Sequence, residues 1–506
     1  MAYLETVPHE ILERIAYLVA TERVIGPPSS LISLLCTNRQ IHSQLSLTNN
    51  QYLYARIYQA KFDFGRLASK LSPNVLAHEL VHRCRILTRI RAQTDSTVRP
   101  RSTEPGDTVY ELLFHAYLMM LENAGNNERQ LRDYANIGNW LRNYLFDEHL
   151  PLLRGTNRVE NWPLQNEHTS LAMWLFWFLL RPDDYTGDDD LTWNVLNFLK
   201  VYALGAHKYQ LTDPSWVKFL PEPPERTTPV MHYSEPHQFC TPPLATPAIL
   251  AFLTLVNLKT KQIDFSSHID LPMKSESNEW EHELGRCLSL SRPDFGNTLT
   301  ECFQSGSVEG TWEGIFTYTE FTAYAALLQG APPPILQKSV IVRHRQTWKL
   351  REHHFVDRFE GDTRQPLSAG DPLRAYLPNG TRLLEKPDCL LVQDPLTKKE
   401  LRYTRPVLGE ADEEEDEKPQ MVVRDVIITG EGHSAWGQFN LIGRVRPCDG
   451  FISLCKEYIE PDRGKWIYRG YLVGNVNSNL AGRWRDTLSP AAVPGYEGCF
   501  LMTRRR

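Results

Sequence analysis

The chain has 506 residues, more than one hydrophobic core usually serves, so we expect roughly two to four domains of about 150 residues each. Hydrophobic residues make up 42% of it and aromatic residues 10%, which provides material for packed cores and excludes a generally disordered protein. The formal net charge of −6, from 61 acidic and 55 basic residues, provides no basic field for a phosphate backbone, so nucleic acid is not an expected partner.

The cysteines and the apolar runs indicate where the protein resides. Nine cysteines are scattered without any Cys-x-x-Cys pair, which favours reduced thiols in a reducing compartment. The first residues lack a basic segment followed by an apolar one, so we expect no secretory signal and an intracellular location in the cytoplasm, the nucleus or both. The most apolar run, Leu171–Leu180, has about half the length of a membrane span and predicts a buried helix and no membrane partner.

Residues 8–48 show the helical period. A first helix, with Pro8 in its first turn, has its apolar residues on one stripe: Ile11, Leu12, Ile15, Leu18 and Val19. The segment 26–30 then breaks the chain and leaves Ser29 or Ser30 to cap a second helix. The apolar side of this helix carries Leu31, Leu34, Leu35, Ile41 and Leu45. Further helices are expected at 50–61 and 73–91, before a polar linker that ends at residue 107.

Two groups of residues in this region carry a recognisable pattern. The first contains Leu4, Val7, Pro8, Glu10, Ile11 and Ile15, and the second contains Leu31, Leu34, Leu35 and Cys36. Together they resemble the F-box, in which a Pro-led helix and a second helix form a small module whose apolar outer edge binds a Skp-type adaptor. The physics agrees, because a module of about forty residues cannot bury all its Leu and Ile side chains alone.

The resemblance extends to residue 91, since 53–63 and 84–91 are similar to the extended N-terminal region of fungal F-box proteins. It implies a non-catalytic subunit that recruits an unidentified protein substrate to a Skp/cullin/F-box ubiquitin ligase for ubiquitination. The two groups above would form the adaptor-binding site, and no cofactor or catalytic residue is implied. The chain departs from the family at Val7, where Leu commonly precedes the Pro, and in the Gly-Pro-Pro insertion between the helices, which bears on docking geometry.

A rival signal is the segment His78–His82, which matches the helical zinc motif H-E-x-x-H of metallopeptidases. No downstream residue stands in a recognisable third-ligand motif, and Glu111 and His115 are the nearest candidates. We therefore expect no bound metal and keep a zinc metallopeptidase as an alternative. The pair His353–His354 and the cluster 281–283 are expected at the polar surface, because neither has partners at zinc-site spacing.

Residues 108–304 are predicted to form a mainly helical middle region. Helices are expected near 108–123, 128–146, 167–180, 190–204 and 246–259. Pro-rich crossings at 221–229 and 240–243 deny the backbone both helical and ladder hydrogen bonds.

After residue 305 the pattern changes to the alternation of short strands. Candidate strands are 310–318, 338–342, 346–350, 422–429, 437–445, 450–458, 465–473, 480–486 and 497–502. They predict a closed antiparallel β-barrel-like domain of lipocalin or avidin type, in which the first and last strands pair. The acidic run at 409–418 is expected to loop outside this barrel, since it could not be buried without uncompensated charge.

A Gly-x-Trp element recurs in this region, at Trp312, Trp466 and Trp484. We expect these indoles to fill the barrel, and a small-ligand-binding β-barrel with a Trp-lined lumen stays an alternative. The chain is thus predicted to be α+β in four parts. These are an F-box at 1–48, a helical extension and linker at 49–107, the helical middle region at 108–304, and a substrate-binding β-barrel-like domain at 305–506.

Overall fold

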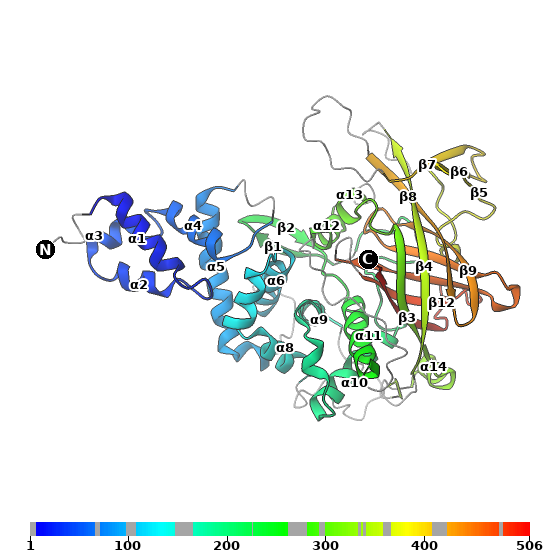
Figure 1. Ribbon diagram of the computed structural model, residues 1–506, viewed down its shortest axis with the longest axis horizontal. Coiled ribbons are helices and arrows are strands. Elements are labelled where there is room, and N and C mark those ends of the chain that lie inside the picture. The colour runs from blue at the N-terminus through cyan, green and yellow to red at the C-terminus, as the bar shows by residue number, and fades with distance from the viewer. Residues whose placement is uncertain are drawn as a thin grey trace. The chain divides into compact units, whose positions relative to one another are not determined.

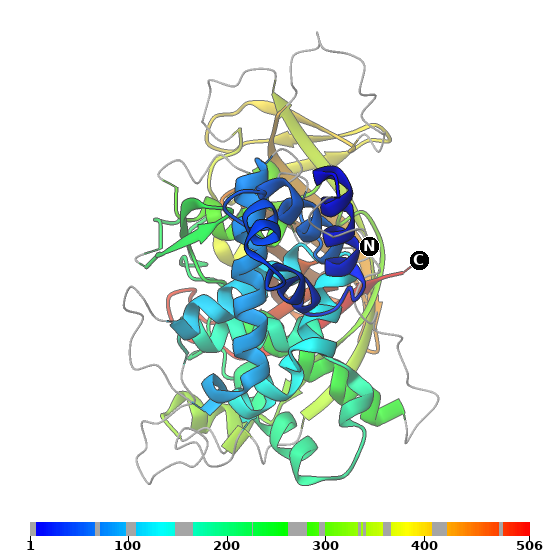
Figure 2. The same ribbon diagram turned by 90° about the vertical axis from the view of Figure 1, so that its left-hand side faces the viewer.

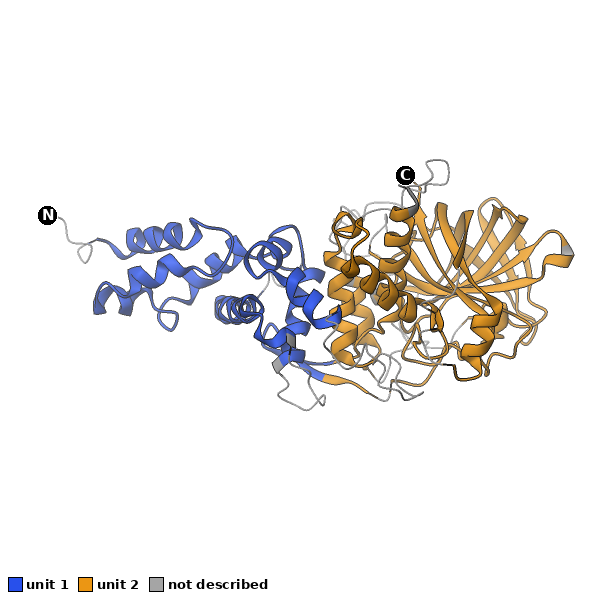
Figure 3. Ribbon diagram, turned by 90° about the horizontal axis from the view of Figure 1, so that it is seen from below, with its two compact units in different colours: residues 1–147, 229–238 blue, residues 148–228, 239–506 orange. Residues whose placement is uncertain are grey.

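A computed structural model describes most of the chain. The described residues are 7–65, 71–97, 108–146, 165–224, 226–261, 281–292, 299–331, 335–336, 341–357, 366–406, 422–474 and 479–505. They fall into two compact units (Figure 3): unit 1 comprises 1–147 and 229–238, and unit 2 comprises 148–228 and 239–506. The predicted middle region is therefore divided, because its first helices belong to unit 1 and its later ones to unit 2.

The described residues of unit 1 form helices and one hairpin (Figures 1 and 2). Its helices are α1 (His9–Thr21), α2 (Ser29–Leu35), α3 (Arg39–Leu45), α4 (Gln51–Lys61), α5 (Pro73–Ala92), α6 (Thr108–Leu121), α7 (Asn126–Arg129) and α8 (Ile137–Phe146). The hairpin, β1 (Thr228–His232) and β2 (Glu235–Phe239), was not expected from the sequence. Helix α5 packs beside both α4 and α6 (Figure 2).

The segment predicted as one helix after Ser30 is two helices. Helix α3 begins at Arg39 because Asn38 is extended and its side-chain oxygen accepts a hydrogen bond from the Ile41 N–H at 2.8 Å. Ser29 is the first residue of α2 and makes no side-chain cap. The prediction of a single helix capped by Ser29 or Ser30 is therefore wrong, and the strong cap at Asn38 is the reason.

A buried ionic network lies in the core of unit 1. Arg83 on α5 is 1% exposed and donates to Glu79 at 2.9 Å and to Glu122 at 2.5 Å. Its guanidinium also lies 5.1 Å from the centre of the Tyr58 ring and donates to the Tyr233 hydroxyl at 3.2 Å. Buried charges of this kind are tolerated only when each has its partners.

Replacing Arg83 by Met is expected to destabilise unit 1 by about 3–5 kcal/mol, because Glu79 and Glu122 would stay buried without a counter-charge. Urea unfolding followed by circular dichroism measures the change. Arg85 lies two residues further along α5 and is exposed, so it provides the matched control. Arg85→Met should change stability by about 0.5 kcal/mol or less. Equal effects of the two substitutions would contradict the network's role.

Unit 2 is built on a closed antiparallel β-barrel, to which eight of the described strands belong (Figure 1). The strands are β3 (Gly310–Thr319), β4 (Ile341–Asp357), β8 (Val422–Ser434), β9 (Gly437–Val445), β10 (Ile452–Tyr458), β11 (Lys465–Val473), β12 (Asn479–Asp486) and β13 (Glu497–Arg504). Their order is β3-β13-β12-β11-β10-β9-β8-β4, and β4 pairs with β3 to close the ring. The predicted pairing of the first and last strands is confirmed, with Leu501 opposite Ile315.

The lumen of the barrel is packed with side chains. Trp312, Trp348 and Trp484 are each at most 1% exposed and lie in one apolar cluster with Phe500 and Met502. Two facing glycines let β11 and β12 approach inside it, since a Cβ on Gly482 would lie 1.9 Å from the Arg469 carbonyl oxygen. Trp312 and Trp484 of the Gly-x-Trp elements therefore fill the barrel as expected, and Trp466 packs against the same cluster.

Three further strands extend the sheet beyond β4 and were not predicted. They are β5 (Arg382–Glu385), β6 (Cys389–Gln393) and β7 (Glu400–Thr404), and they enclose a small second core around Leu390, Val392 and Tyr403. The sheet thus has eleven described strands. The acidic run 409–418 lies outside the described residues.

The helices of unit 2 lie outside the barrel (Figure 1). They are α9 (Glu167–Leu179), α10 (Asp190–Leu204), α11 (Ala245–Lys261), α12 (Glu281–Ser289), α13 (Leu299–Cys302) and α14 (Phe321–Leu328). Helix α11 packs on the outer face of β12 and β13. Arg483 of β12 reaches the C-terminal turn of α10 and donates to the carbonyls of Tyr202 at 2.8 Å and Ala203 at 3.1 Å. Cations at helix C-termini are favourable, so this contact ties the helices to the barrel.

Candidate functional site

Helices α1 and α2 both carry large apolar side chains that are exposed to solvent. The buried face of α1 consists of Leu12, Ala16 and Ala20, whereas Ile11 and Leu18, on another stripe, are each 52% exposed. On α2 the neighbouring Ile32 is 60% exposed. We use the name apolar edge for the following apolar residues of this region, each of which is exposed or half-buried: Val7, Pro8, Ile11, Ile15, Leu18, Ile32, Leu34, Leu35 and Cys36.

Most residues that the F-box resemblance places at the adaptor site lie on this edge. Glu10 is exposed beside it, in the first turn of α1. Leu31 instead packs inside the module at 2% exposure, so it would support the edge from within. Leu4 lies outside the described residues.

Leu18 and Ile32 belong to the edge but were not among the expected site residues. The i+7 spacing from Ile11 is a signal that could have included Leu18. Ile32 directly follows the buried Leu31 and so faces another direction of the helix, and no motif position indicated it.

The module that carries the edge is held by polar contacts within unit 1. The Asn50 amide donates to Glu13 of α1 at 2.5 Å, while its side-chain oxygen accepts from the Leu53 N–H at 3.1 Å. The Arg56 guanidinium lies 4.6 Å from the centre of the Tyr17 ring. These contacts fix α1 against α4, so the edge is presented by a preorganised surface.

The Gly-Pro-Pro insertion between α1 and α2 is also anchored. Lys61 donates to the carbonyls of Arg23 at 2.5 Å and Gly26 at 3.1 Å, and burial lowers the pKa of its ammonium. The Gln130 side chain accepts from the Gly26 N–H at 2.7 Å and donates to the Val24 carbonyl at 2.8 Å. Gly26 has φ +84°, a conformation that favours glycine, so the insertion forms one defined turn.

The zinc motif at His78–His82 does not assemble as a peptidase site. His78 is exposed and bonds the Asn74 carbonyl at 2.8 Å, and Glu79 is engaged by Arg83, so it is not free to act as a general base. His82 instead lies with Glu111 and His115, the two candidates that sequence reasoning left without context.

The pair His353–His354 and, within the cluster 281–283, the carboxylate Glu283 were expected at the polar surface but are buried, so that expectation is wrong for these three residues. His353 and His354 are at most 3% exposed: His353 bonds the Thr429 hydroxyl at 2.9 Å, and His354 bonds Glu352 at 2.8 Å. Glu283 is likewise buried, paired with Arg286. Each of these side chains has at least one partner from its own or a neighbouring element, which offsets the cost of burial, while the His353 Nδ1 has no hydrogen-bond partner among the described residues.

Lys456 is a functional candidate that sequence reasoning missed. It lies in the barrel lumen at 1% exposure, and its ammonium donates to the Gln346 side chain at 3.2 Å. Aromatic rings surround it, with the Phe439 centre at 3.9 Å and the Tyr458 centre at 4.8 Å. Burial lowers the pKa of Lys456 to about 7. The alternation Ile452, Leu454, Lys456 could have indicated that this side chain points inward.

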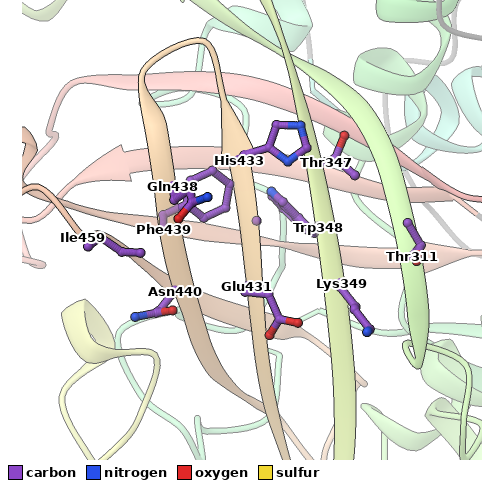
Figure 4. Close-up of a pocket in the computed structure, with 11 residues that line it drawn as sticks. Thr311, Thr347, Trp348, Lys349, Glu431, His433, Gln438, Phe439, Asn440 and Ile459 are labelled. Atoms are coloured by element: carbon purple, nitrogen blue, oxygen red, sulfur yellow. The ribbon is translucent and has the colours of Figure 1, made fainter.

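An open hollow of about 350 Å³ lies over strands β3, β4, β8 and β9 (Figure 4). Trp348 and Phe439 point into the barrel core, so the alternating Lys349, Glu431 and Asn440 face outward into solvent. The hollow presents charges of both signs together with amide and imidazole groups. Such a lining suits contact with a polar protein segment better than an apolar small molecule.

No known protein family, curated protein or solved structure gives a match to this chain. Among the described helices, none combines the length and apolar character needed to cross a bilayer.

Proposed function

We propose that the chain is an F-box-type substrate-recognition subunit, whose apolar edge binds a Skp-type adaptor of a cullin–RING ubiquitin ligase. The observation that carries the proposal is the apolar edge itself, because it coincides with the residues that resemble the F-box. Partially exposed Leu and Ile side chains on a rigid helical module are the surface that a partner helix covers. The protein would work inside the cell, in the cytoplasm, the nucleus or both.

The barrel unit would hold a protein substrate, with no chemistry of its own. Ubiquitination would be accelerated by proximity, since binding raises the effective concentration of substrate lysines near the charged enzyme. The packed lumen supports a protein-binding barrel over a small-ligand carrier, and the polar outer hollow offers a contact surface. The ion pair of Glu79 with Arg83 counts against a metallopeptidase. No cofactor, nucleic acid or membrane is part of the proposal.

Substituting Ile32 by Asp is expected to abolish co-purification with a Skp-type adaptor. A carboxylate buried without a partner costs several kcal/mol, and each 1.4 kcal/mol is tenfold in affinity, so binding should weaken at least about 100-fold. Ile32 is 60% exposed, so the variant should stay folded, which circular dichroism checks. Leu34→Asp should act in the same direction, although Leu34 is half-buried and its substitution also perturbs packing.

Tyr52 on α4 provides the matched control, because it is 61% exposed in the same unit but outside the apolar edge. Tyr52→Asp should bind the adaptor as the parent chain does, measured by pull-down and titration calorimetry. Undiminished binding by a folded Ile32→Asp protein would remove the proposed function.

A further inference from the structure

Three potential metal ligands converge between α5 and α6 in unit 1. His82 lies on α5, and Glu111 and His115 lie four residues apart on one face of α6. Their ligand atoms all lie within 4.8 Å of one another, and the two imidazole centres are 4.0 Å apart. Donors on one tetrahedral zinc ion are about 3.5 Å apart, so a shift of about 1 Å would bring the set onto a shared ion.

The Glu111 side chain is 51% exposed and therefore is not held by close packing, and its oxygen lies 4.0 Å from the His82 Nε2. That distance is too long for a hydrogen bond. The His82 Nε2 is buried without a hydrogen-bond partner among the described residues. A polar atom that is buried without a hydrogen bond destabilises the fold, and coordination of a cation by that atom would offset this cost.

The nearest cationic side chain is already paired with carboxylates. Arg83 is the nearest positive group, but Glu79 and Glu122 pair with it at 2.9 and 2.5 Å, so its charge is compensated. His232 lies 3.3 Å from Glu122.

We propose that His82, Glu111 and His115 bind one zinc ion, with water in the fourth position. The donor set of two imidazoles and one carboxylate suits Zn²⁺ better than Ca²⁺ or Mg²⁺, which prefer oxygen ligands. The proposal departs from the expectation of no metal, which rested on the lack of an identifiable third ligand for the pair His78 and His82. It is independent of the proposed adaptor function.

Three protein ligands with water in the fourth position also occur in catalytic zinc sites. Here Glu79, the base of the sequence motif, is engaged by Arg83 and is not available as a general base, so the role assigned to the ion is structural. The ion would instead clamp α5 to α6, and unit 1 would gain stability from zinc by mass action. The clamp joins residues 29 to 33 positions apart in the sequence, which neither helix can hold together by its own hydrogen bonds.

The test uses the full chain, stripped with a chelator and then exchanged into Zn²⁺ or Co²⁺. We expect one zinc per chain by elemental analysis, a rise in the unfolding temperature on adding Zn²⁺, and tetrahedral Co²⁺ absorption bands. Glu111→Gln and His82→Gln should weaken zinc binding by more than the roughly 10–100-fold lost when a ligand's own hydrogen-bond partner is changed. Because Glu111 is exposed, its variant keeps the test valid if the histidine variant folds poorly.

His78→Ala is the matched control, since His78 is exposed on the same helix and outside the set. It should keep the zinc stoichiometry and the cobalt spectrum of the parent chain. Absence of zinc binding, zinc retained unchanged in Glu111→Gln and His82→Gln, or zinc lost equally in His78→Ala would each overturn the proposal.

Discussion

Truncating the chain after Asp486 is expected to abolish the cooperative unfolding transition of unit 2. The truncation removes β13, which pairs with β12 on one side and with β3 on the other. It also removes Phe500 and Met502 from the lumen, where burial of each side chain stabilises by about 1.5–3 kcal/mol. A domain has a free energy of unfolding of about 5–15 kcal/mol. The loss of these side chains, together with two rows of ladder hydrogen bonds, would remove most of it.

The truncated chain would also expose the edges of β3 and β12, so aggregation should accompany the loss of structure. Thermal denaturation followed by near-ultraviolet circular dichroism, with size-exclusion chromatography, measures both effects. Deletion of 410–417 is the control: the acidic run is expected to loop outside the barrel, and loop-closure entropy changes slowly with length, so the cost should be small. If the chain truncated after Asp486 stayed folded while the deletion of 410–417 unfolded unit 2, the barrel would be wrongly assigned.

Replacing Lys456 by Met is expected to stabilise unit 2, most strongly at and below pH 7. The folded pKa of about 7 lies below the ordinary value of 10.5, so the unfolded chain binds more protons between these values. Wild-type stability therefore rises with pH across this window, and the charged lysine is least favourable below pH 7. At 1.36 kcal/mol per pKa unit, the difference across the window is on the order of 5 kcal/mol.

Met fills similar volume, and Gln346 keeps a contact with the Tyr468 hydroxyl at 3.4 Å, so the substitution leaves little unsatisfied. Urea unfolding of both proteins at pH 6.5 and pH 9.5 measures the effect as a difference between them. Lys349→Met, at an exposed position of β4, should show no such pH-dependent difference. A Lys456→Met protein that is less stable than the parent at both pH values would refute the account of the buried amine.

Local patterns determined much of this protein. The alternation of apolar residues placed β9 and β11 at their observed bounds, and the 3.6-residue period placed α4, α5 and α9. The ten-residue apolar run was correctly interpreted as a buried helix, because α9 is buried on every side from His168 to Leu179. The apolar stripe of α1 was also visible, since a helical stripe is a property of sequence spacing alone.

The tertiary structure alone decided the features that depend on distant pairing. Strands β5 to β7 are four or five residues long and exist because β7 and β6 pair beside β4. His353 and His354 look like surface residues by type, yet in the interior His353 bonds Thr429 of β8 and His354 bonds Glu352 of its own strand. His82 meets Glu111 and His115 only because α5 packs on α6. Sequence spacing fixes which side chains share a face, whereas contacts between faces follow from long-range packing that a single sequence does not display.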